Sequence, residues 1–79
     1  MTNRKSVWVG FVETNNDISL FAGNTQADVK AEIAGWCKEN WGDLNDGIIP
    51  ATDDEIIEGY FSYWSDENER CHVEEVEVR

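Results

Sequence analysis

Residues 24–41, NTQADVKAEIAGWCKENW, mark the point where the spacing of apolar residues changes from two to about 3.6. The apolar residues of this segment form one stripe at helical spacing, made of Val29, Ile33, Trp36 and Cys37. Thr25 is a preferred N-cap residue, and Asp28, three positions later, suits the positive end of a helix. The segment therefore predicts an amphipathic helix that begins after Thr25 and ends near Gly42.

Before this helix, residues 6–23, SVWVGFVETNNDISLFAG, alternate between two faces as β-strands do. The first strand has Val7, Val9 and Phe11 on one face and Trp8, Gly10 and Val12 on the other. Ile18 and Leu20 share one face of the second strand, and the intervening TNND supplies turn residues. The segment predicts a β-hairpin.

After the helix, residues 42–52, GDLNDGIIPAT, are turn material, and Thr52 with Glu55 forms the pattern of a capping box. We expect a second helix from about residue 53 to 62, with one apolar face made of Ile56, Ile57, Tyr60, Phe61 and Trp64. The alternative is a strand over residues 60–64, because aromatic residues favour sheets and Gly59 costs a helix about 1 kcal/mol.

The last segment, CHVEEVEVR at residues 71–79, reads as a closing strand. Val76 and Val78 share a face and Val73 lies on the other, so a bulge near Glu74 and Glu75 would bring all three valines inward. The expected fold is a single α+β domain over residues 1–79 in the order ββααβ. It has a three-stranded sheet with two helices packed on one face, and the closing strand can pair with either hairpin strand.

The charge balance restricts the class of partner. Seventeen acidic residues against six basic ones give a formal net charge of −11, which repels nucleic acid and anionic membrane surfaces and attracts basic protein surfaces. No segment approaches the ~20 apolar residues of a membrane span, and MTNRKSVWVGFVE lacks the pattern of a signal peptide. We expect a cytoplasmic protein, in the host cytoplasm if phage-encoded, that is a monomer or a homodimer with reduced Cys37 and Cys71.

Residues that carry enzyme chemistry are few. The single histidine, His72, cannot pair with Cys71 because neighbouring strand side chains point to opposite faces, whereas Cys37 with His72 remains geometrically possible. Residues 43–54, DLNDGIIPATDD, resemble a calcium loop, but Gly47 and Ile48 stand where a third ligand and the sharp-turn glycine belong. We therefore expect no catalysis, no cofactor and no metal site.

The strongest functional signal is a run of acids. Residues 39–69 contain ten carboxylates and no Lys or Arg. One interpretation is a solvated face that only aids solubility; the other is a functional acidic surface, which the uncompensated repulsion between neighbouring acids favours. We expect this surface to be formed by Asp53, Asp54, Glu55, Glu58, Asp66, Glu67 and Glu69.

Aromatic residues interrupt the acidic run. Four tryptophans are many for a 79-residue core, although all four can lie in it or at its edge. The alternative is that Trp41 and Tyr63 anchor an interface inside an acidic rim, with charge attracting a basic partner and aromatic contacts holding it.

Carboxylates at i and i+2 on a strand, or i and i+4 on a helix, lie about 5–7 Å apart, similar to the spacing of charges along a nucleic-acid strand. With the runs ENWGDLNDG, TDDEIIEG and SDENE, the chain resembles the small acidic anti-CRISPR and antirestriction proteins of phages and mobile elements that mimic DNA. This resemblance implies a non-catalytic inhibitor that blocks the nucleic-acid-binding site of a host defence complex.

Two alternatives stay open. An immunity protein or antitoxin is also small and acidic, and some of these proteins neutralise a basic toxin nuclease by covering it. The third class is an accessory phage protein in which the acids only confer solubility and the aromatic residues form a homodimer. A neighbouring toxin gene would favour the immunity protein or antitoxin, and the size of the protein in solution tests the homodimeric accessory protein.

Overall fold

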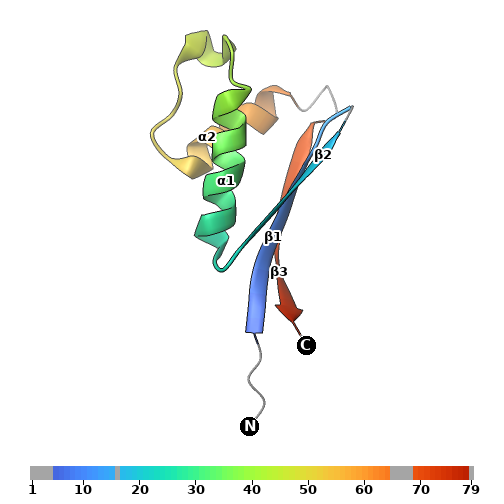
Figure 1. Cartoon of the computed structure of the whole chain (residues 1–79). Coiled ribbons are helices and arrows are strands. Elements are labelled where there is room, and N and C mark those ends of the chain that lie inside the picture. The colour runs from blue at the N-terminus through green and yellow to red at the C-terminus, as the bar shows by residue number, and fades with distance from the viewer. Residues whose placement is uncertain (1–4, 16, 65–68, 79) are drawn as a thin grey trace.

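The computed structural model describes residues 5–15, 17–64 and 69–78. The chain forms one three-stranded sheet with two helices on the same side of it, which confirms the expected α+β fold in ββααβ order (Figure 1). The elements in chain order are β1 (Lys5–Glu13), β2 (Ile18–Gly23), α1 (Gln26–Glu39), the short 3-10 helix η1 (Leu44–Gly47), α2 (Asp53–Tyr63) and β3 (Arg70–Val78).

The sheet has the order β2-β1-β3, so the closing strand pairs with the first hairpin strand, and both pairings are antiparallel. The register between β1 and β3 runs without interruption from Lys5 opposite Val78 to Glu13 opposite Arg70. The bulge expected near Glu74 and Glu75 is therefore wrong, because the β1–β3 hydrogen-bond ladder continues past them. As a result Val73 packs against the core, whereas Val76 lies on the other face and is 39% exposed.

Helix α1 forms as its apolar stripe predicts. The Thr25 hydroxyl oxygen accepts a hydrogen bond from the Asp28 backbone N–H at 3.1 Å, which confirms the N-cap. The helix ends at Glu39, a little before the expected Gly42, with Asn40 as its C-cap: the side-chain amide of Asn40 donates to the carbonyl oxygen of Trp36 in addition to the backbone N–H. Helix α1 contacts all three strands, and α2 packs mainly against α1.

Helix α2 confirms the capping box and extends to Tyr63, so the strand alternative for residues 60–64 is wrong. The Glu55 backbone N–H donates to the Thr52 hydroxyl oxygen at 3.2 Å, and that hydroxyl donates to Glu55 Oε1 at 2.8 Å. Gly59 lies within this helix despite its low helix propensity. A Cβ atom at this position would meet Cη2 of Trp41 at 3.5 Å, an ordinary van der Waals contact, so the packing of the indole ring does not require the glycine.

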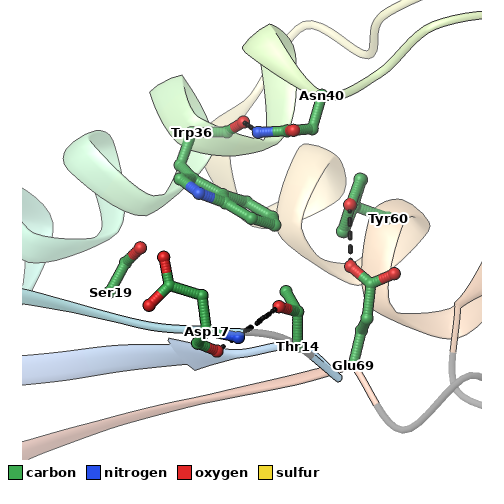
Figure 2. A pocket seen from close by; sticks show the side chains of 7 residues that line it. All are labelled: Thr14, Asp17, Ser19, Trp36, Asn40, Tyr60 and Glu69. Carbon is green, nitrogen blue, oxygen red and sulfur yellow. Dashed lines mark hydrogen bonds between the residues drawn. The ribbon is translucent and has the colours of Figure 1, made fainter.

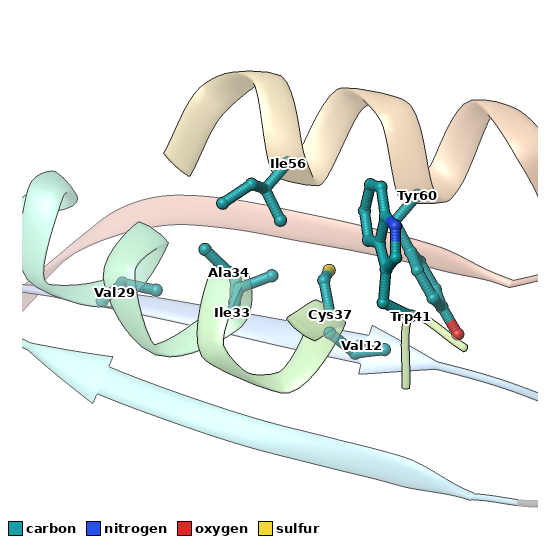
Figure 3. Close-up of a cluster of buried hydrophobic side chains, with 8 residues drawn as sticks. All are labelled: Val12, Val29, Ile33, Ala34, Cys37, Trp41, Ile56 and Tyr60. Atoms are coloured by element: carbon teal, nitrogen blue, oxygen red, sulfur yellow. The ribbon is translucent and has the colours of Figure 1, made fainter. Parts of the chain in front are cut away.

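The core lies between the sheet and the two helices (Figure 3). Gly10, in the central strand, lets α1 approach the sheet, because a Cβ atom there would lie 2.8 Å from Val29 Cγ1 and 3.1 Å from Ile33 Cδ1. The buried hydrophobic residues are Val12, Val29, Ile33, Ala34, Cys37, Trp41, Ile56 and Tyr60.

The two faces of the sheet differ in what covers them. We call the face against α1 the inner face and the opposite one the outer face. Leu20 is 80% exposed on the outer face, and Ile18 is 55% exposed beside it. By the strand register, the outer face consists of Val7, Val9, Phe11 and Glu13 of β1, Ile18, Leu20 and Ala22 of β2, and Arg70, His72, Glu74 and Val76 of β3.

Candidate partner-binding surface

Thr52 is the N-cap of α2, so the helix begins at Asp53 and its first turn contains the acids Asp53, Asp54 and Glu55. Carboxylates in a first helical turn are favourable because they face the positive end of the helix dipole. Asp54 and Glu55 are exposed and Asp53 is half-buried; Glu58 follows one turn later and is exposed. Four of the expected surface acids therefore share one short helix.

One of these acids has a basic partner that the local sequence does not reveal. Lys30 of α1 contacts Asp54, with 2.9 Å between Nζ and Oδ1. The two residues are twenty-four positions apart, so the pair follows from the packing of α1 against α2 and not from helical spacing. An exposed pair of this kind stabilises a protein by about 0.2–1 kcal/mol.

A mainly apolar pocket of about 360 Å³ lies between the later part of α2 and the segment that joins the two helices. Trp41 is 4% exposed, so it does not project as an interface anchor; its ring instead forms part of the pocket wall. Tyr63 is 63% exposed and lies at the same pocket. The structure thus brings the two expected anchors together, one as buried wall and one as exposed side chain. The pocket is lined by Trp41, Leu44, Asn45, Pro50, Gly59 and Tyr63.

The segment between the helices shapes this pocket. Asn45 and Asp46 adopt left-handed backbone conformations, with φ of 52° and 57°, and Gly47 follows with φ of 79°. The side-chain amide of Asn45 donates to the carbonyl oxygen of Ile48 at 3.1 Å, and the Ile48 N–H donates to the Asn45 carbonyl oxygen at 3.0 Å. Asn tolerates this conformation better than most residues, so the sequence DLNDG is suited to a compact turn at the pocket edge.

Glu69 lies apart from the α2 acids, in a second hollow of about 370 Å³ between the hairpin end and the two helices (Figure 2). Its Oε1 accepts a hydrogen bond from the Tyr60 hydroxyl at 2.9 Å. We call this hollow the polar cleft; its walls also include Thr14, Asp17, Ser19, Trp36 and Asn40. Of these residues, sequence reasoning had singled out Glu69 alone for partner binding. The expected surface acids Asp66 and Glu67 lie outside the described residues.

The two cysteines lack the features of nucleophiles. Burial, with smaller effects of Cys71 and Glu69, raises the pKa of the Cys37 thiol to about 12, and burial also raises the pKa of Cys71. Cys37 is in the core on the inner side of the sheet, whereas His72 lies on the outer face beside Phe11. The Cys37–His72 pair considered from the sequence therefore does not form, because the sheet separates the two side chains.

Within residues 5–15, 17–64 and 69–78, no group of three or more His, Cys, Asp or Glu side chains is placed to hold a metal ion. No helix in the described part of the chain has the length and apolarity needed to cross a membrane. Comparison of the chain with protein families, with curated proteins and with solved structures finds no match. The function is therefore argued from the surface itself.

Proposed function

We propose that this protein is a non-catalytic inhibitory module whose acidic surface occupies a basic, nucleic-acid-binding site of a bacterial defence complex. Such a site is lined by Lys and Arg, and a carboxylate-bearing surface is complementary to it. The segment from residue 39 to 69 contributes ten carboxylates and no basic residue to the chain. It is the segment that contains α2 and the apolar pocket.

The observation that carries this proposal is that α2, the helix with four of the acids, also forms part of the wall of the apolar pocket. Glu55, Gly59 and Tyr63 are spaced four residues apart on α2, so an exposed carboxylate lies in line with two pocket residues. In protein interfaces an apolar hollow supplies affinity, and charged groups elsewhere on the same surface supply orientation and rate. A merely solvated acidic face needs no pocket of this kind.

The proposal is tested by capture from a bacterial lysate at low salt, followed by elution with excess duplex DNA and identification by mass spectrometry. We expect a nucleic-acid-binding complex that DNA displaces. Retention should fall steeply between about 50 and 500 mM salt, because exposed charges are screened. A partner that DNA does not displace would contradict the proposed mode of inhibition, and a DNA-displaced toxin nuclease would favour the immunity alternative.

Matched variants locate the contact. The double variant Glu55→Gln/Glu58→Gln removes two charges from α2 and preserves the capping pattern, because Gln also serves in a capping box. The control variant Glu32→Gln/Glu74→Gln removes two charges from exposed positions on α1 and the outer face. We expect the first variant to lose capture at moderate salt and the second to keep it. Equal loss in both would mean that net charge alone is responsible.

One observation favours the accessory alternative, in which the protein acts as a homodimer. The outer face exposes Ile18, Leu20 and Val76, and a bare apolar patch of this kind marks an interaction surface. The charges on the outer face favour a second copy of this chain as the partner that covers the patch. The outer-face acids lie near bases of the same face: Glu13 Oε1 is 2.6 Å from Arg70 Nε, and Glu74 Oε2 is 3.8 Å from His72 Nε2. Two copies that meet there keep their acidic α2 helices apart.

Light scattering of the purified protein tests this alternative. A homodimer should become monomeric in Leu20→Glu, and the control Ala31→Glu, which adds the same charge at an exposed position on α1, should stay dimeric. A wild-type monomer at the highest soluble concentration would contradict the homodimer.

A further inference from the structure

The polar cleft differs from the apolar pocket in the chemistry of its walls. It lies between the end of the β-hairpin, the last turn of α1, Tyr60 of α2 and the residue before β3. Two of its walls are aromatic: Trp36 is half-buried, and Tyr60, whose ring meets the Trp36 ring edge-on at 5.2 Å, is 4% exposed. Figure 2 shows the carboxylates of Asp17 and Glu69 on opposite sides of the cleft, with the Trp36 indole between them.

Three of the side-chain donors around the cleft, those of Tyr60, Asn40 and Thr14, are already used within the protein. The Tyr60 hydroxyl donates to Glu69 Oε1 at 2.9 Å, and the Asn40 side-chain amide donates to the Trp36 carbonyl oxygen at 2.8 Å. The Thr14 hydroxyl donates to the carbonyl oxygen of Asp17 at 3.3 Å. The Ser19 hydroxyl and the Trp36 indole N–H also line the cleft, but acceptors are in the majority, because two carboxylates and the amide oxygen of Asn40 offer several lone pairs.

The charge of the cleft has one sign. Its lining includes the carboxylates of Asp17 and Glu69 and, among the described residues, no Lys, Arg or His. A ligand that matches acceptors, negative charge and aromatic walls must be a cation that donates several hydrogen bonds. A guanidinium group meets these conditions best, because it is planar, carries five N–H donors and stacks on aromatic faces, whereas an ammonium is a compact point charge.

We propose that the polar cleft binds a guanidinium group, supplied by an arginine side chain of the protein partner. The source of the arginine rests on the proposed function, since a nucleic-acid-binding site is rich in this residue. The binding itself depends only on the cleft. Glu69 is the main carboxylate contact, held by the Tyr60 hydroxyl, and Trp36 provides the stacking face. The apolar pocket and the polar cleft then lie on two sides of α2, through Gly59 and Tyr63 on one side and Tyr60 on the other.

The test is an NMR titration of the purified full chain with N-acetyl-arginine amide, a probe that needs no target protein. We expect saturable shifts at the Trp36 indole N–H and at the backbone of residues 17–19. The neutral isostere N-acetyl-citrulline amide should give none, and N-acetyl-lysine amide should bind more weakly. Equal binding of the lysine and arginine compounds would overturn the assignment to guanidinium. Free arginine binding more tightly than the blocked compound would overturn a protein side chain as the source.

Two variants locate the site. Glu69→Gln keeps an acceptor for the Tyr60 hydroxyl and removes one charge, and we expect about tenfold weaker binding of the arginine probe. Glu74→Gln removes one charge from the outer face of β3, the strand that follows Glu69, and should bind as the wild type does. Equal weakening in both variants, or shifts spread evenly over the acidic residues, would overturn the cleft as the site.

This experiment is separable from the capture experiment. If the arginine probe does not bind while capture and DNA displacement succeed, the cleft proposal fails and the proposed function stands. If the probe binds at the cleft and the lysate yields no DNA-displaced partner, the proposed function fails and the guanidinium site stands.

Discussion

The inner and outer faces of the sheet are built from alternate residues of the same strands, yet they meet different surroundings. On the inner face Val12 is 1% exposed and Gly10 leaves space for α1. On the outer face Leu20 is 80% exposed. The period of two supplies apolar residues to both faces, and the covering helices decide which of them is buried.

The two faces also differ in how charge is arranged. Each outer-face acid, Glu13 and Glu74, lies near a base on the same face, whereas the acids of α2 sit on a segment that contains no base, and Asp54 takes its partner from α1. Among the described residues, the charges of the outer face are therefore nearly balanced, and most of the excess negative charge lies elsewhere in the chain. The net charge of −11 is therefore distributed unevenly over the molecule.

The largest effect is expected at the inner face. Ile33 is fully buried against the sheet, and Ile33→Ala should lower the free energy of unfolding by about 2–5 kcal/mol, through lost apolar contact and the cavity that remains. Urea denaturation monitored by circular dichroism measures this change. A loss below about 1 kcal/mol would mean that α1 does not pack on the sheet as described.

A second prediction concerns how the stability of the inner-face core, which contains Cys37, depends on pH. The Cys37 thiol has an ordinary pKa of 9.0 and a folded pKa of about 12, so between these values the unfolded state binds fewer protons than the folded state. The free energy of unfolding should therefore fall as pH rises above 9, by about 1.4 kcal/mol per pH unit for this group. Burial and the Glu69 hydrogen bond raise the pKa of Tyr60 as well, which adds to the fall at higher pH.

Denaturation in reductant at pH 8 to 10 checks this prediction. The variant Cys37→Ala should show a distinctly smaller decline over that range, although it is less stable at neutral pH. An equal slope in the variant and the wild type would contradict the burial of the thiol.

A third substitution tests how closely α1 approaches the inner face. Gly10→Ala places a methyl group 2.8 Å from Val29 Cγ1 and 3.1 Å from the His72 carbonyl oxygen, so it should destabilise the fold by about 1–3 kcal/mol. Gly35→Ala is the matched control, because a Cβ atom there meets nothing within 4 Å and alanine favours a helix. The control should be stabilised by about 0.5–1 kcal/mol. A neutral Gly10→Ala would show that the sheet and α1 are farther apart.

The smallest effect is expected at the outer face. Leu20→Ala changes a side chain that is 80% exposed, and the free energy of unfolding should change by less than about 0.5 kcal/mol in the monomer. Denaturation at several protein concentrations distinguishes this case from a homodimer, in which the wild type grows more stable with concentration and the variant does not. A large, concentration-independent loss would contradict an uncovered outer face.

Much of the fold follows from local patterns. The caps at Thr25 and Thr52, the alternation of residues 7–12 and the apolar spacing of α1 each depend on neighbours in the chain, and each was predicted. The pairing of β3 with β1, its unbroken register and the position of Val76 depend on contacts between distant segments. A bulge was predicted there because alternation alone placed one valine apart from the others.

The site was predicted less well, for the same physical reason. The acids of α2 are visible in the sequence, but the Lys30–Asp54 pair and the burial of Trp41 come from the packing of α1, α2 and the connecting segment. The polar cleft joins Asp17, Trp36 and Glu69 from three parts of the chain, and no short motif signals it. Gly10, which by propensity alone weakens a strand, is the position where Val29 and Ile33 of α1 approach the sheet.

The central claim is that the acidic surface of α2, and not α1 or the outer face, blocks a nucleic-acid-binding site. The most direct measurement is side-by-side capture at low salt by the wild type, by Glu55→Gln/Glu58→Gln and by Glu32→Gln/Glu74→Gln, each eluted with duplex DNA. We predict that the wild type and the second variant retain a nucleic-acid-binding complex that DNA releases, whereas the first variant does not. Retention of the same complex by the α2 variant, or a partner that DNA leaves bound to the wild type, would contradict the claim.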